Sequence, residues 1–97
     1  MKTIESKSHT DDEFHVIRLT EPTRLVFDKA VEGFIISTPD EEILFGWDYQ
    51  NSDKFTKDNA MLLKPFDNMK DFKKITFTHL YLMPKEKPCT VYVTITK

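Results

Sequence analysis

The chain has 97 residues, a length that predicts one domain, and its single cysteine excludes an internal disulfide framework. Hydrophobic residues make up 39% of the sequence, and no apolar run approaches the roughly 18 residues that a membrane-spanning helix needs. The net charge of −2 argues against a nucleic-acid-binding protein, which would carry a basic surface.

Charge is distributed unevenly along the chain. Residues 1–53 contain 5 Lys and Arg against 12 Asp and Glu, whereas residues 54–97 contain 9 against 4. Such an asymmetry allows an acidic patch of one copy to face a basic patch of the next. The alternative is that these charges are solvated and have no partner.

Residues 1–12 are polar and show no hydrophobic period. We therefore expect a flexible N-terminal arm, which either frays or clasps a neighbouring molecule. The arm has no apolar segment of the kind that a secretory signal contains. Ile4 and His9 are its candidate contacts.

About seven short segments rich in β-branched and aromatic residues follow, with turn residues between them. They cover residues 14–20, 23–27, 31–38, 43–47, 60–64, 75–82 and 89–96. Residues 28–30 and 39–42 are expected turns, and Gly33 indicates a bulge or a close backbone approach. The pattern predicts an all-β fold, a small antiparallel β-sandwich of jelly-roll or immunoglobulin-like type, as a single domain over residues 13–97.

Residues 48–59 form the longest segment without an apolar pattern, and we expect a loop, with Tyr49 and Phe55 as candidate contacts. Trp47 and Tyr49 stand at its start beside polar side chains. Aromatic faces with nearby amides and carboxylates can hold sugar rings, which predicts a carbohydrate site. The alternative is that Trp47 fills the core at the end of its strand.

The last two segments, residues 75–82 and 89–96, flank a polar turn bounded by prolines, which predicts a β-hairpin. Apolar and polar residues alternate regularly in the second of them. Cys89 is therefore expected to be a small buried hydrophobe, and Tyr92 to lie on the opposite, half-wet face.

The segment 75–82 is apolar on both faces, because Leu80 and Leu82 alternate with other apolar residues. A strand of this kind needs cover on both sides, from a second sheet or from another protein chain. The preceding residues, 67–74, predict a polar connection that holds at most one helical turn.

No catalytic motif is present. The histidines His9, His15 and His79 do not have the i,i+2 or i,i+4 spacing typical of metal ligands, and the acidic run 40–42 lacks the alternating pattern of a calcium loop. With two glycines in the chain, a glycine-rich phosphate loop cannot be built. We expect no enzymatic activity, no cofactor and no metal.

Five short segments carry a resemblance to known proteins. They are residues 34–36, 44–46, 63–65, 80–82 and 90–93, which read Phe-Ile-Ile, Leu-Phe-Gly, Leu-Lys-Pro, Leu-Tyr-Leu and Thr-Val-Tyr-Val. In this layout, which spans residues 28–96, the chain resembles small β-sandwich structural proteins of tailed bacteriophage particles, among them capsid-decoration, head-fibre and tail or receptor-binding subunits. The resemblance implies a homo-oligomeric part of a virion, without catalysis.

These observations lead to one hypothesis and two alternatives. The hypothesis is a non-catalytic structural or attachment subunit of a phage virion, synthesised in the host cytoplasm, that forms a homo-oligomer through its arm and sheet surfaces. Its expected partners are itself, other virion proteins and a glycan, but not nucleic acid or a membrane. The candidate contact residues are Ile4, His9, Trp47, Tyr49, Phe55, Leu80, Leu82 and Tyr92. The alternatives are a monomeric carbohydrate-binding module that uses Trp47 and Tyr49, and an accessory or inhibitor domain that docks by its sheet edge.

Overall fold

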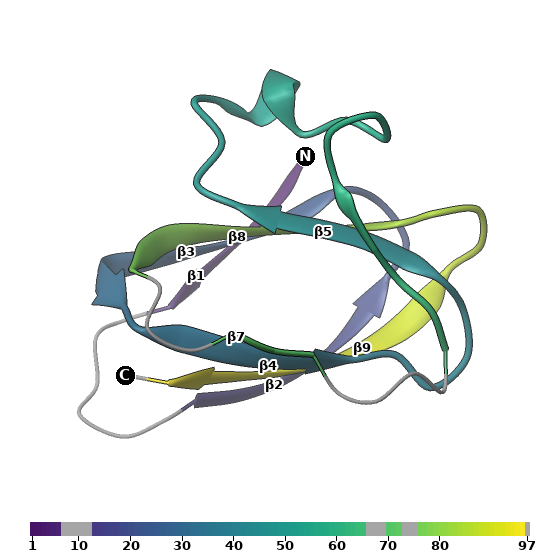
Figure 1. Ribbon diagram of the computed structural model, residues 1–97, viewed down its shortest axis with the longest axis horizontal. Helices are drawn as coiled ribbons and strands as arrows, with labels where there is room; N and C mark the ends of the chain where they lie inside the picture. Colours follow the sequence, from purple (N-terminus) through teal and green to yellow (C-terminus); the bar gives the residue numbers. More distant parts are fainter. Residues whose placement is uncertain (7–12, 66–69, 73–75, 97) are drawn as a thin grey trace.

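The computed structural model describes residues 1–6, 13–65, 70–72 and 76–96, and shows two β-sheets packed face to face (Figure 1). The first, sheet A, has the strand order β1-β3-β8-β5-β6, and the second, sheet B, has the order β2-β9-β4-β7. The strands are β1 (Lys2–Ser6), β2 (Glu13–Leu19), β3 (Thr23–Val31), β4 (Gly33–Ser37), β5 (Ile43–Trp47), β6 (Met61–Leu63), β7 (Lys70–Phe72), β8 (Phe77–Pro84) and β9 (Cys89–Thr96). The prediction of an all-β sandwich is confirmed.

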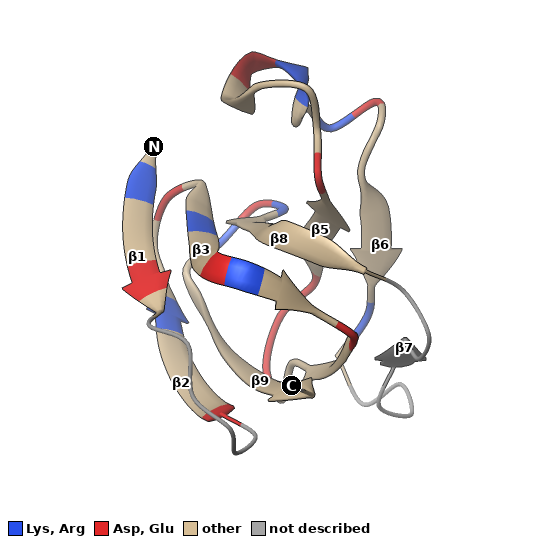
Figure 2. Ribbon diagram, turned by 90° about the vertical axis from the view of Figure 1, so that its left-hand side faces the viewer, with Lys and Arg blue, Asp and Glu red and all other residues tan. Residues whose placement is uncertain are grey.

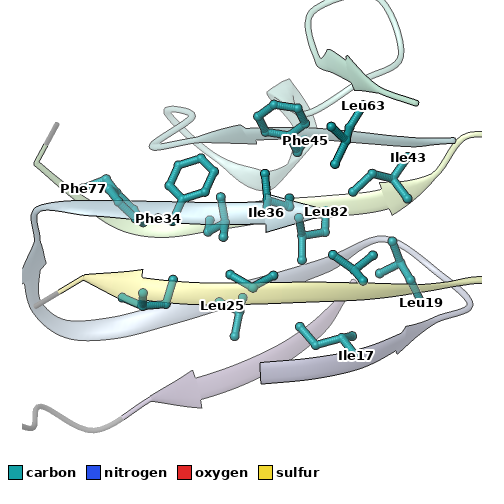
Figure 3. Close-up of a cluster of buried hydrophobic side chains, with 14 of the residues drawn as sticks. Ile17, Leu19, Leu25, Phe34, Ile36, Ile43, Phe45, Leu63, Phe77 and Leu82 are labelled. Carbon is teal, nitrogen blue, oxygen red and sulfur yellow. The ribbon is translucent and has the colours of Figure 1, made fainter. Parts of the chain in front are cut away.

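The main core lies between the two sheets and is built from one face of each (Figure 3). Its centre is Phe34 of β4, whose ring meets those of Phe77 and Phe45 edge-on, at centroid distances of 5.4 and 6.2 Å. Burying a side chain of this size contributes about 2–3 kcal/mol. Edge-to-face pairs interlock the two layers, because rings from sheet B insert between rings from sheet A.

Strand β9 follows its sequence pattern closely. Its burial alternates along the strand, so Cys89, Val91, Val93 and Ile95 line the core. The thiol of Cys89 is buried, and this burial raises its pKa to about 11. At neutral pH the side chain is a protonated, inert hydrophobe, as its position on the apolar face predicts.

The last two strands do not form the expected hairpin. Strand β8 pairs with β3 and β5 in sheet A, whereas β9 pairs with β2 and β4 in sheet B. The turn between them therefore crosses from one sheet to the other. Both strands have an apolar face, and the chain buries these two faces against each other across the core instead of pairing the strands edge to edge.

The expected turn at residues 28–30 is also absent. Strand β3 continues through these three exposed residues to Val31, with a register shift against β8 between Val26 and Val31. Phe77, which pairs with Val31 beyond this shift, lies in the main core with Leu80 and Leu82, although strict alternation would put it on the other face.

The N-terminal segment differs from the expected arm. Residues Lys2–Ser6 form β1, which pairs in parallel with β3 from Thr23 to Phe27. Ile4 packs against the main core, and the Arg24 Nε donates to Thr3 Oγ1 at 2.9 Å. A single apolar residue between polar neighbours is enough for this edge strand, which partly buries Ile4, buries Ser6 and pairs its backbone with β3. Residues 7–12, which include His9, lie outside the described residues.

Strand β7 lies within the expected polar connection and pairs with β4. The described part of the chain thus holds nine strands where about seven were expected, and the two additional ones, β1 and β7, are short edge strands.

Candidate interaction surface

The chain itself covers the outer face of sheet A over β5 and β8. Residues 48–60, here called the 48–60 loop, connect β5 to β6 and lie above sheet A, on the side away from sheet B (Figure 1). Phe55 of this loop is 6% exposed and forms a second cluster with Leu44, Tyr81 and Met83. The expectation that β8 needs cover on both faces is thus met without a partner chain: sheet B covers one face, and the 48–60 loop covers the other.

Tyr49 is the central ring of this cover. Its centroid lies 5.3 Å from those of both Phe55 and Tyr81, and its hydroxyl donates to the Asn59 carbonyl at 2.7 Å. Partial burial raises the pKa of Tyr49. The ring occupies the space above Gly46, where a Cβ would come within 2.6 Å of Tyr49 Cε2 and 2.8 Å of its Cζ. Glycine at this position therefore makes room for the cover.

Asp48 fastens the start of the loop to sheet A. It has a φ of 49°, and its carboxylate accepts hydrogen bonds from the backbone N–H groups of Thr78 (3.0 Å) and His79 (2.9 Å). Further along, the short 3-10 turn at Ser52–Lys54 is capped by Asn51, and Arg24 Nη1 donates to Ser52 Oγ at 2.9 Å. These contacts make the loop a fixed part of the fold.

Trp47 and Tyr49 lie on opposite faces of sheet A. Trp47 is half-buried and packs against the main core, with its ring 5.7 Å from that of Phe34 on the opposing sheet. Tyr49 packs in the second cluster, on the outer face. The two rings therefore do not form the shared platform on which the carbohydrate hypothesis depends, and the alternative, that Trp47 packs against the core, describes its position.

The outer face of sheet B is different, because large apolar side chains lie open on it. Phe14 and Val16 of β2 are 64% and 59% exposed, and Tyr92 of β9 is 38% exposed. The rings of Phe14 and Tyr92 stack at 6.3 Å with an interplanar angle of 12°, and Val16 is the cross-strand partner of Tyr92. We call these three residues the β2 strip. No element in the described part of the chain packs over it.

The structure brings few of the other expected contact residues to the surface. Leu80 and Leu82 have no exposed surface, because they point into the main core, and Phe55 is buried in the second cluster. They therefore offer nothing to a partner. Of the expected residues, Tyr92 lies in the exposed strip, and Ile4 of β1 is partly buried against the main core.

Phe14 and Val16 were missed from the sequence, although a signal was present. Apolar residues occur on both faces of the 14–20 segment, since Phe14 and Val16 lie on one face and Ile17 and Leu19 on the other. This is the same double pattern that marks the segment 75–82. Ile17 and Leu19 are buried in the core, and the other face remains open.

A polar cluster joins the end of β1 to the start of β2. Glu13 accepts a hydrogen bond from Ser6 Oγ, and its Oε2 lies 3.2 Å from His15 Nε2. Both side chains contact the carboxylate, so the order differs from that of a catalytic triad, in which histidine lies between the acid and the nucleophile. In the described part of the chain, no three His, Cys, Asp or Glu side chains come together as a metal site requires.

A cavity of about 300 Å³ lies where the β4–β5 turn and the β8–β9 turn approach Pro65. Its other lining residues are charged: Glu41, Glu42, Lys85 and Glu86. Lys85 Nζ lies 2.9 Å from Glu42 Oε2, and this contact raises the pKa of Lys85. Small-molecule sites are mainly apolar with a few polar groups, so this open, charged hollow does not have the character of one.

Comparison with protein-family models, with curated proteins and with solved structures finds no match. Within residues 1–6, 13–65, 70–72 and 76–96, no helix has the length and apolar character of a membrane span.

Proposed function

We propose that this chain is a non-catalytic structural subunit that assembles with further copies of itself through sheet B. The observation that carries the proposal is the exposure of Phe14 and Val16, at 64% and 59%, on the edge strand of that sheet. Isolated apolar side chains are common on protein surfaces, but a contiguous apolar strip next to an unpaired strand edge is typical of a protein contact.

The rest of the surface supports assembly better than chemistry. The 48–60 loop already covers the outer face of sheet A over β5 and β8, and the described cavity near Pro65 is lined by charge. The β2 strip offers aromatic area, which dominates the energetics of many protein interfaces. It is flanked on β9 by threonines that supply a polar rim.

Light scattering across a hundredfold dilution tests the proposal. The wild-type chain is expected to remain a discrete multimer, and the double variant Phe14→Ser, Val16→Ser is expected to be monomeric at every concentration. Leu62→Ser is the matched control, because Leu62 is a 41%-exposed apolar side chain on sheet A, and this variant should keep the wild-type mass. A wild-type chain that is monomeric throughout would contradict the proposal.

The finer proposal places this assembly in the particle of a tailed bacteriophage. It is supported by the short segments that resemble small phage sandwich subunits and by the β-sandwich architecture itself. Mass spectrometry of particles purified from cells that produce the chain is the test. We expect the chain at a fixed ratio to the major structural protein, and its absence from the particles would reject the virion role while leaving self-assembly in place.

A further inference from the structure

The four sheet edges of the sandwich differ in how well they are protected. Edge strands expose unpaired backbone groups, and proteins usually blunt them with short length, lysine, proline or a bulge. Strand β6 has three residues and runs into Lys64 and Pro65, β7 has three residues, and β1 carries Lys2 and Glu5 on its exposed positions.

Strand β2 has none of these protections. It has seven residues, contains no lysine or proline, and pairs with β9 in one unbroken register from Glu13 to Leu19. In the described part of the chain, β9 is its sole strand partner. Glu13 and Arg18 lie near its two ends, and the residues between them include no Lys, Arg, Asp or Glu (Figure 2). Figure 2 also shows β2 along one side of the sandwich, beside β1 of the other sheet, to which Ser6 and Glu13 connect it.

We infer that β2 pairs with β2 of a second copy in antiparallel orientation, about a two-fold axis at Val16, and joins the two copies of sheet B into one continuous sheet. This inference deepens the proposed function and rests on it. Val16 is the central residue of the strand, so this axis alone pairs all seven residues, and each one-residue displacement of the axis removes two of them. A two-fold contact is self-complementary, which is the commonest way for identical chains to associate.

The side chains that this register brings together are compatible. On the outer face, Val16 meets Val16 of the second copy, and Phe14 meets Arg18 of the second copy. The arginine side chain is 60% exposed and is held on this face by Thr90 Oγ1 at 3.3 Å and Asp40 Oδ2 at 3.5 Å. A guanidinium beside an aromatic ring is an attractive pair, and no like charges stand opposite each other. The charge pattern of β2 thus fits a second, reversed copy of itself.

Disulfide trapping tests the register. Residues directly opposite in an antiparallel pair have Cα atoms about 4.5–5.5 Å apart, which lies within the range that a disulfide spans. We expect Val16→Cys to form a covalent dimer on mild oxidation. The matched control is Tyr92→Cys, on the same face but one strand further in, where the two copies are separated by roughly 14 Å, or three strand spacings, and should not react. The native Cys89 is fully buried with a pKa of about 11, so it does not compete.

The outcomes separate the inference from the proposed function. Pairing through β2 is supported if the wild-type chain is a multimer, the Val16→Cys variant forms a covalent dimer and the Tyr92→Cys variant does not. A wild-type multimer in which Tyr92→Cys reacts and Val16→Cys does not would replace edge pairing by packing of the two sheet faces. A multimer in which neither variant reacts overturns the inference but keeps self-assembly, whereas a wild-type monomer overturns both.

A charge substitution gives an independent measurement. Val16→Lys would place two ammonium groups opposite each other at the axis, and we expect the dimer dissociation constant to rise at least about tenfold. Because Val16 is largely exposed in the single chain, the variant should fold. An unchanged dissociation constant would reject the axis at Val16. Thr94→Lys, on β9 of the same face, is the control and should leave edge pairing intact.

Discussion

The two outer faces of the sandwich meet the same physical problem in different ways. On sheet A, apolar side chains of β5 and β8 point outward, and the 48–60 loop folds back to bury them under Phe55 and Tyr49. On sheet B, Phe14, Val16 and Tyr92 point outward, and no described element covers them. An outward apolar pattern by itself therefore does not identify an interface, because the chain can cover such a face with its own residues.

The cover on sheet A is expected to matter most to stability. Phe55→Ala removes the ring that closes the second cluster and should lower the free energy of unfolding by about 3–5 kcal/mol, as for other buried phenylalanines. Urea denaturation, monitored by tryptophan fluorescence, measures this loss of stability. The loss should not depend on protein concentration, because the cover is intramolecular. A change below about 0.5 kcal/mol, as is usual for surface substitutions, would mean that the loop does not hold the sheet.

Gly46→Ala tests whether the Tyr49 ring needs the space above Gly46. The added methyl group would overlap the Tyr49 ring. The ring would have to move, and we expect this movement to lower the free energy of unfolding by about 1–3 kcal/mol. The control is the same substitution in a Tyr49→Ala background, where the space is empty. Equal penalties in the two backgrounds would show that Tyr49 is not the group that Gly46 accommodates.

Asp48→Ala removes the acceptor of two backbone N–H groups and puts alanine at a positive φ. The hydrogen bonds are partly exposed, so we expect a loss of about 1–2 kcal/mol. Asp48→Asn keeps one side-chain oxygen and tolerates the backbone angle, and it should recover most of the stability. Asp48→Gly keeps only the backbone angle and should fall between the two, and any other order in the unfolding curves would contradict this account.

Phe14→Ala should have the smallest effect on the single chain. It truncates a ring of the same type as Phe55, but one that is 64% exposed, so at high dilution the free energy of unfolding should change by less than about 0.5 kcal/mol. At high concentration the variant should lose the stabilisation that assembly gives the wild-type chain. A loss as large as that of Phe55→Ala, and independent of concentration, would mean that the β2 strip is part of the fold itself.

Much of the architecture follows from local patterns in the sequence. Alternation in residues 89–96 predicts the buried face of β9 and the exposed position of Tyr92, and turn residues predict most of the strand ends. The pairing of the strands does not follow in the same way. An apolar face on each of β8 and β9 is satisfied equally by a hairpin on one sheet or by two strands facing each other across the core, and only the second occurs. Similarly, a polar segment such as Lys2–Ser6 becomes a strand because an unpaired edge of β3 is available.

Of the β2 strip, the sequence predicted only the exposure of Tyr92. The segments 14–20 and 75–82 both carry apolar residues on two faces, and this pattern does not say which faces the chain covers. Leu80, Leu82 and Phe55 turn inward, whereas Phe14 and Val16 stay open. Sheet B covers Leu80 and Leu82, whereas the burial of Phe55 depends on where the 48–60 loop lies. The position of the loop is set by contacts such as those of Asp48 with β8 and of Tyr49 with Asn59.

The class of fold, the buried face of β9 and the inert state of Cys89 thus follow from the sequence, because they depend on patterns within single segments. The tertiary structure decided which strands are neighbours, that Trp47 and Tyr49 are separated by a sheet, and that β2 is a long edge strand with an uncovered apolar face. These properties depend on long-range packing, because the local pattern of a segment is compatible with several different neighbouring strands. The free energy of the whole molecule decides between them.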